Sequence, residues 1–157
     1  RHVDLRHPHH RLERALGLVS ARRQRIGQHA GRDLPGDAPA VLAPAALALL
    51  ATIADDVDFR IDHYRDDADT SWQVARNQAD LLTVLQRLGT EIFPQGTQIV
   101  HTHSQPLGDD WVMTQLSQRF FYGVQQREVE SLTWILSHSQ NGQLDYFRET
   151  VTTITPT

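Results

Sequence analysis

The sequence predicts a small α+β domain in which helices come first and an antiparallel sheet forms the C-terminal half. A length of 157 residues suits a single hydrophobic core. Up to Phe93 most apolar residues recur at helical spacing, whereas after Gly96 they alternate with a period of two. Short turn signals separate the alternating segments, and strands joined by short turns pair antiparallel.

Composition is that of an ordinary globular protein, with 39% hydrophobic and 22% charged residues. No apolar run approaches the roughly 20 residues that a membrane-spanning helix needs, and no secretory signal pattern is present. There is no cysteine, which excludes disulfides and thiolate chemistry. We therefore expect a cytoplasmic protein with no membrane partner.

The first 38 residues differ from the rest in charge. All fifteen basic residues are Arg, and eight of them fall within residues 1–32. Apolar spacing predicts an amphipathic helix over 8–30, followed by a Gly/Pro linker over 31–39. The segment lacks the aromatic side chains that stack on bases, so we expect no nucleic-acid partner. We predict a basic helical extension with its linker over 1–38 and the main domain over 39–157.

Two further helices and one strand are predicted before the sheet. A helix is expected over Pro44–Ala54, and the alternation that follows predicts a strand over Val57–Asp62 with Val57 on its apolar side. A Thr70-x-x-Gln73 capping box predicts the start of a long helix whose apolar stripe includes Ala75 and which stops at Pro94.

Four long strands are predicted after Gly96. They span Thr97–Leu107, Trp111–Tyr122, Gln125–Ser139 and Gln143–Ile154. Gly108-Asp109-Asp110, Gly123 and Asn141-Gly142 separate them, and Asn-Gly is the strongest short signal for a hairpin turn. The four strands should therefore form an antiparallel meander with the helices on one face.

Three segments together resemble the SnoaL-like polyketide cyclase family. They are LALLATIADDVDFRI (47–61), VHTHSQPLGDDWVMTQ (100–115) and SLTWILSHSQNGQLDYFRETVTT (131–153). The superfamily includes ketosteroid isomerases, limonene epoxide hydrolases and nuclear transport factors. The resemblance implies a cystatin-like cone, or α+β barrel, in which a curved sheet wraps around a long helix and encloses an apolar pocket. Residues 1–40 have no counterpart in this pattern.

The resemblance also points to Glu149 as a catalytic acid/base, because it occupies the position of an Asp on the last strand of these enzymes. Strand parity places Asp145, Phe147, Glu149 and Val151 on one face. In an apolar pocket, desolvation would raise the pKa of Glu149 towards a range useful for abstracting a proton next to a carbonyl. The alternative is a surface carboxylate paired with a nearby Arg. Epoxide hydrolases carry an Arg-x-Asp pair where this chain has Leu116 and Gln118, so their full constellation is absent.

His101 and His103 are the other catalytic candidates. They share one strand face, and either could orient Glu149 or polarise a substrate carbonyl if that face points inward. Such a pair can also bind a metal, but nothing in the sequence supplies a third ligand, so we expect no metal and no cofactor. A partly exposed strand position is the preferred interpretation of both histidines.

Five side chains are candidates for contacting a ligand in the predicted pocket. The large aromatic ones would form walls for a planar ligand, and the polar ones within apolar strands need a partner that a ligand could supply. Core packing or solvent exposure would explain them as well. They are Trp72, Gln118, Thr133, Trp134 and Phe147.

Two functions remain open on the sequence alone. The first is a cofactor-free isomerase, cyclase or hydrolase acting on a small hydrophobic carbonyl or epoxide compound. The second is a non-catalytic module that binds a hydrophobic ligand or dimerises on the same fold. A four-stranded meander covered on one face leaves Trp111, Met113 or Trp134 on the other, and we therefore expect a homodimer.

Overall fold

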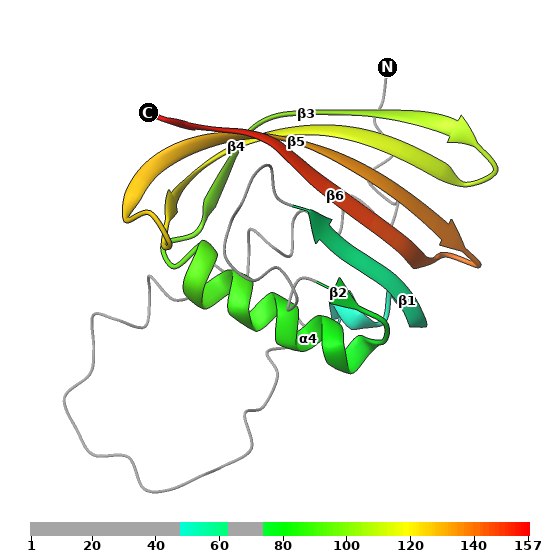
Figure 1. Cartoon of the computed structure of the whole chain (residues 1–157). Helices are drawn as coiled ribbons and strands as arrows, with labels where there is room; N and C mark the ends of the chain where they lie inside the picture. The colour runs from blue at the N-terminus through cyan, green and yellow to red at the C-terminus, as the bar shows by residue number, and fades with distance from the viewer. Residues whose placement is uncertain (1–47, 63–73) are drawn as a thin grey trace, which may run out of the picture.

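The computed structural model describes residues 48–62 and 74–157. The predicted extension over 1–38, the helix over 8–30, the capping box Thr70–Gln73 and Trp72 all lie outside these residues. A single sheet dominates the described part (Figure 1). No helix in that part is long and apolar enough to cross a membrane.

The sheet has six strands in the order β2-β1-β6-β5-β4-β3. The predicted meander is confirmed, with β3 (Thr97–Gly108), β4 (Trp111–Tyr122), β5 (Arg127–Gln140) and β6 (Gln143–Pro156) pairing antiparallel in turn. β1 (Ile53–Asp62) then joins β6 in parallel, and the two-residue β2 (Val74–Ala75) closes that edge. The meander is local in sequence, whereas the β1–β6 pairing joins the two ends of the domain.

The β5–β6 hairpin turns at the predicted Asn141-Gly142 pair. Both residues have positive φ, 53° and 78° respectively. This is the turn geometry that matches the twist of two antiparallel strands, and Asn and Gly are the residues that adopt it at least cost. The turn fixes the first pairs of the hairpin, Gln140↔Gln143 and Ser139↔Leu144, and a register shift follows between Ser139 and His138.

β1 begins earlier than expected. Only residues 48–50 of the helix predicted over Pro44–Ala54 are both described and helical, and β1 already starts at Ile53. The reason is tertiary, because Ile53 pairs with Leu144 of β6 and both are fully buried. The predicted face of the strand is confirmed, since Val57, Phe59 and Ile61 all enter the core.

The long predicted helix is shorter and begins later. α4 spans Gln78–Arg87, and its N-cap is Asn77, whose side chain accepts a hydrogen bond from the Asp80 backbone N–H at 2.8 Å. Ala75 is not helical but lies in β2, where it pairs with Phe59 and is fully buried. Figure 1 shows the sheet curling over α4.

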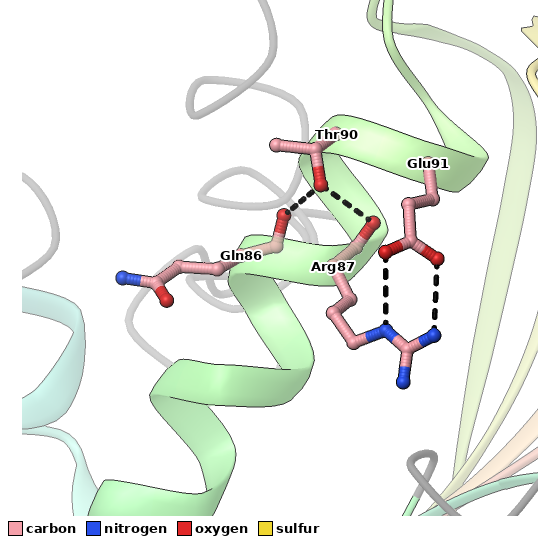
Figure 2. Close-up of polar contacts among 4 residues, drawn as sticks. All are labelled: Gln86, Arg87, Thr90 and Glu91. Atoms are coloured by element: carbon pink, nitrogen blue, oxygen red, sulfur yellow. Dashed lines mark hydrogen bonds and ion pairs between the residues drawn. The ribbon is translucent and has the colours of Figure 1, made fainter.

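A five-residue π-helical turn, η2 (Leu88–Ile92), continues α4 and leads into β3. Figure 2 shows its polar side, where the Arg87 guanidinium donates to both carboxylate oxygens of Glu91 at 3.2 and 3.1 Å. The Thr90 hydroxyl donates to the Gln86 carbonyl at 2.9 Å. The opposite side carries Leu88 and Ile92 into the core that α4 shares with the concave face of the sheet. η2 therefore closes one end of the space beneath the sheet.

Candidate functional site

A cavity of about 50 Å³ lies between η2 and the concave face of the sheet. Its lining comes from β1, η2 and its C-terminal flank, and all four strands of the meander. Most of the lining is apolar, as expected for a small-molecule site. The apolar residues are Ile61, Leu88, Ile92, Phe93, Ile99, Leu116, Phe120, Ile135, Phe147, Val151 and Ile154, together with the ring of Tyr122.

Glu149 lies on the wall of this cavity, as strand parity predicts. Its partners in register are Ile61 on β1 and Ile135 on β5, both of which also line the cavity. Its residue surface is only 7% exposed. A carboxyl group placed among apolar side chains loses hydration, and proteins rarely retain one there without a partner or a function.

Gln118 and Thr97 add polar groups from the neighbouring strands. The Thr97 hydroxyl donates to the Gln118 side-chain oxygen at 2.9 Å, and both residues line the cavity. Gln118 is buried, because it lies on the inward face of β4. It can therefore contact a ligand in the cavity, as predicted. The hydrogen bond fixes the plane of the Gln118 amide.

Ser131 is a cavity residue that the sequence reasoning missed. It faces Gln118 directly across the β4–β5 pair and is 2% exposed. Within the described residues its hydroxyl oxygen has no hydrogen-bond partner. The sequence contains a signal for this placement, because Ser131 lies two residues before the candidate Thr133 and residues two apart on a strand share a face.

The histidine predictions require correction. His101 and His103 pair with Ser117 and Gln115 on the convex face of the sheet, and both are exposed. Thr97 and Ile99 face the cavity, so an unbroken strand would have placed both histidines inward. The register shifts between Ile99 and His101, and this bulge moves them to the other face. They therefore cannot orient Glu149.

The remaining candidate ligand contacts lie on opposite faces of the sheet. Phe147 lines the cavity, stacked on Phe59 with ring centroids 4.7 Å apart. Thr133 faces the same concave side and is fully buried, but it is not part of the cavity lining. Trp134 lies on the convex face, 41% exposed, opposite Gln115. The expected ligand contact from Trp134 is therefore corrected.

Asp145 also departs from the predicted face. A second register shift, between His138↔Tyr146 and Ser139↔Leu144, leaves Asp145 as the extra residue of β6. Its carboxylate contacts the His138 Nδ1 at 2.6 Å, and Trp111 packs on the same imidazole at 4.8 Å between ring centroids. Asp145 thus belongs to a polar and aromatic cluster outside the cavity.

The cluster of Asp145, His138 and Trp111 is not a metal site. Within residues 48–62 and 74–157, no three His, Asp or Glu side chains gather closely enough to hold an ion. The described residues contribute one carboxyl, one amide and the hydroxyls of Thr97, Ser131 and Tyr122 to the cavity wall. This set suits proton transfer and hydrogen bonding to a small, mostly apolar molecule.

No protein-family model and no curated protein matches the chain. Solved structures do. A provisionally named isomerase from Rhodopseudomonas palustris is similar with a TM-score of 0.60 at 19% identity, over 94% of this chain and 90% of that one. Bal32a, from a soil-derived mobile gene cassette, has a TM-score of 0.58 at 10% identity, over 92% and 88% of the two chains.

An NTF2-like protein from Burkholderia xenovorans is also similar, with a TM-score of 0.52 at 18% identity over 68% of this chain and 76% of that one. Identities this low show a shared architecture, and one architecture carries many activities. The curled sheet over α4 agrees with what the three resembling segments implied. The chain therefore has an α+β fold similar to that of NTF2-like proteins.

Proposed function

We propose that this protein is a cofactor-free acid/base enzyme, an isomerase or cyclase, that acts on a small hydrophobic carbonyl compound. The observation that carries the proposal is a single one: Glu149, 7% exposed, lies on the wall of a cavity whose other lining is mostly apolar. The similarity to a provisionally named isomerase supports the same class. A hydrolase that opens an epoxide is less well supported, because Leu116 and Gln118 stand where the epoxide-opening pair is expected.

In this mechanism the Glu149 carboxylate removes a proton from a carbon next to the substrate carbonyl. The electron pair of the C–H bond moves into the carbonyl to form an enolate, and Glu149 returns the proton to the same or a conjugated carbon. The apolar wall formed by Ile61, Ile135 and Phe147 limits the access of water to the enolate. Proton transfer by a positioned side chain contributes roughly 10²- to 10⁴-fold in rate.

The test is exchange of the acidic ring protons of 2-tetralone, a bicyclic ketone, in deuterated water. We expect the protein to accelerate exchange and Glu149→Gln to remove at least about 10²-fold of that acceleration. The wild-type rate should rise with pH as the carboxyl ionises, since only the carboxylate accepts a proton, and the variant should lose this dependence. Proton NMR of the ketone measures the rate.

Glu130→Gln is the matched control. Glu130 is a sheet carboxylate on the convex face, where Arg119 donates to it at 2.8 Å, so its loss should leave exchange unchanged. Equal rates for wild type and Glu149→Gln, with both proteins folded by circular dichroism, would eliminate Glu149 as the base.

A non-catalytic ligand-binding module is the second candidate. It is favoured by the placement of His101 and His103 on the convex face, because neither histidine can then orient Glu149 or polarise a substrate carbonyl in the cavity. Binding of 2-tetralone without any acceleration of exchange would select this function.

We also propose that the protein is a homodimer, paired through the convex face of the sheet. Trp111, Met113 and Leu136 on this face are half-buried, and Trp134 is 41% exposed beside them. Together they form an apolar patch of the kind that usually marks an interface. We expect light scattering to give twice the chain mass and Trp134→Arg to shift it to the monomer. A wild-type monomer at high micromolar concentration would contradict the proposal.

A further inference from the structure

The Ser131 hydroxyl is a hydrogen-bonding group that no described residue of the protein bonds to. Its hydroxyl oxygen is buried, lines the cavity and has no hydrogen-bond partner within residues 48–62 and 74–157. A buried hydroxyl without a partner costs about 1–3 kcal/mol of stability. A serine on this wall is therefore expensive unless something in the cavity bonds to it.

Thr133 shows what the same group does away from the cavity. It lies two residues further along β5, on the same face, and its hydroxyl is also buried with no partner among the described residues. However, Thr133 does not line the cavity, so a ligand in the cavity would not contact its hydroxyl. The two residues thus form a natural pair in which only one hydroxyl is available to a ligand.

Gln118 supplies a second group at the same place. It is directly opposite Ser131 in the β4–β5 register, and the Thr97 hydroxyl already occupies its side-chain oxygen. Within the described residues this is its only side-chain hydrogen bond, so its N–H groups remain to donate. A donor from Gln118 and a hydroxyl from Ser131, which can donate or accept, therefore meet on one part of the wall.

This polar pair is well separated from Glu149. The residue opposite Glu149 on β5 is Ile135, four residues beyond Ser131. At about 3.3 Å per residue, the backbone positions are roughly 13 Å apart along the strand. The side chains of Ser131 and Glu149 each span part of this distance. A ligand that contacts both side chains must therefore be about as long as two fused rings.

We propose that Gln118 and Ser131 form a polar anchor that binds a hydroxyl or carbonyl oxygen at the end of the ligand remote from Glu149. The anchor rests on the cavity being the ligand site of the proposed function, but not on Glu149 being a base. The ligand class is accordingly an elongated apolar compound, with a ketone at one end and a second oxygen at the other. Thr97 is a positioning residue, since it holds the Gln118 amide.

The test compares two ketones that differ only at the remote end, 6-hydroxy-2-tetralone and 6-methyl-2-tetralone. A hydroxyl and a methyl group have nearly the same size, so a difference in affinity reports hydrogen bonding. We expect the full chain to bind the hydroxy ketone about tenfold more tightly, as one or two hydrogen bonds in a buried site imply. Calorimetry gives both dissociation constants.

Three variants assign the preference to the anchor. Ser131→Ala and Gln118→Met should each reduce it to about twofold or less, whereas Thr133→Val, the matched control, should keep it. Ser131→Ala should also melt no lower than the wild type, because it removes an unpartnered buried hydroxyl.

Several results would overturn the anchor. They are equal affinity of the wild type for the two ketones, no binding of the hydroxy ketone at about 1 mM, or an unchanged preference in Ser131→Ala. An equal loss in Thr133→Val would show that the effect is packing and not contact. A preserved preference together with no catalysed exchange would reject the proposed enzyme and leave the anchor standing, so the two failures are distinguishable.

Discussion

Gly123→Ala is expected to destabilise the protein by about 3 kcal/mol or more, because a side chain here collides with the backbone of η2. A Cβ built on Gly123 would lie 1.9 Å from the Glu91 carbonyl oxygen. The close approach is held by the Gly123 backbone N–H, which donates to the Ile92 carbonyl at 3.1 Å. Neither group is the end of a flexible side chain, so the β4–β5 turn and η2 must separate.

The separation should also damage the cavity. Leu88, Ile92 and Phe93 come from η2 and its flank, and all three line the cavity beneath the sheet. We therefore expect Gly123→Ala to lower the midpoint of urea unfolding and to abolish binding of 2-tetralone together. Chemical denaturation followed by tryptophan fluorescence measures the first, and calorimetry the second.

Gly142→Ala is the control for this substitution. Gly142 also belongs to a turn, but nothing lies within 4 Å of the position of its Cβ, and only its φ of +78° opposes a side chain. The expected cost is that of a residue in the left-handed region, about 1 kcal/mol. Equal losses for the two variants would show that the contact with Glu91 does not govern the effect.

Phe147→Ala is expected to cost about 3–5 kcal/mol of unfolding free energy. Phe147 is 1% exposed, and its ring stacks on that of Phe59, with an interplanar angle of 6°. The two rings join β6 to β1, whose parallel pairing is the long-range connection of the sheet. Removing one ring leaves a hole at this junction and deletes part of the cavity wall.

Phe121→Ala provides the comparison, since Phe121 is a half-buried phenylalanine opposite Glu128 in the same sheet. Its partial burial predicts a loss of about 1 kcal/mol. Urea titrations of the two variants should therefore differ severalfold in the free energy lost. Similar losses would mean that the Phe59–Phe147 stack contributes little beyond an ordinary sheet contact.

The sequence alone determined the local part of this fold. Alternation with a period of two predicts the bounds of β4, the inward side of β1 and the placement of Phe147 and Glu149 on one face. The Asn141-Gly142 pair predicts the β5–β6 turn and the two residue pairs next to it. These predictions hold because strand periodicity and turn conformation depend on residues that are neighbours in the chain.

Tertiary structure decided the features that depend on distant partners. Ala75 fits a helical stripe, yet it forms β2 because pairing with Phe59 buries it. The parallel pairing of β1 with β6 draws Ile53 into a strand in the same way. Local patterns do not contain these pairings, and tertiary contacts override weak local preferences.

The candidate site shows the same division. Periodicity places Glu149 correctly, because β6 is regular from Tyr146 to Val151. It fails for Asp145, which lies at a bulge where one extra residue reverses the face of the side chains near it. A bulge before His101 likewise turns that histidine away from the cavity. A bulge is set by how one strand fits its neighbour, and only the assembled sheet shows that Ser131 and Gln118 face the cavity while both histidines face away from it.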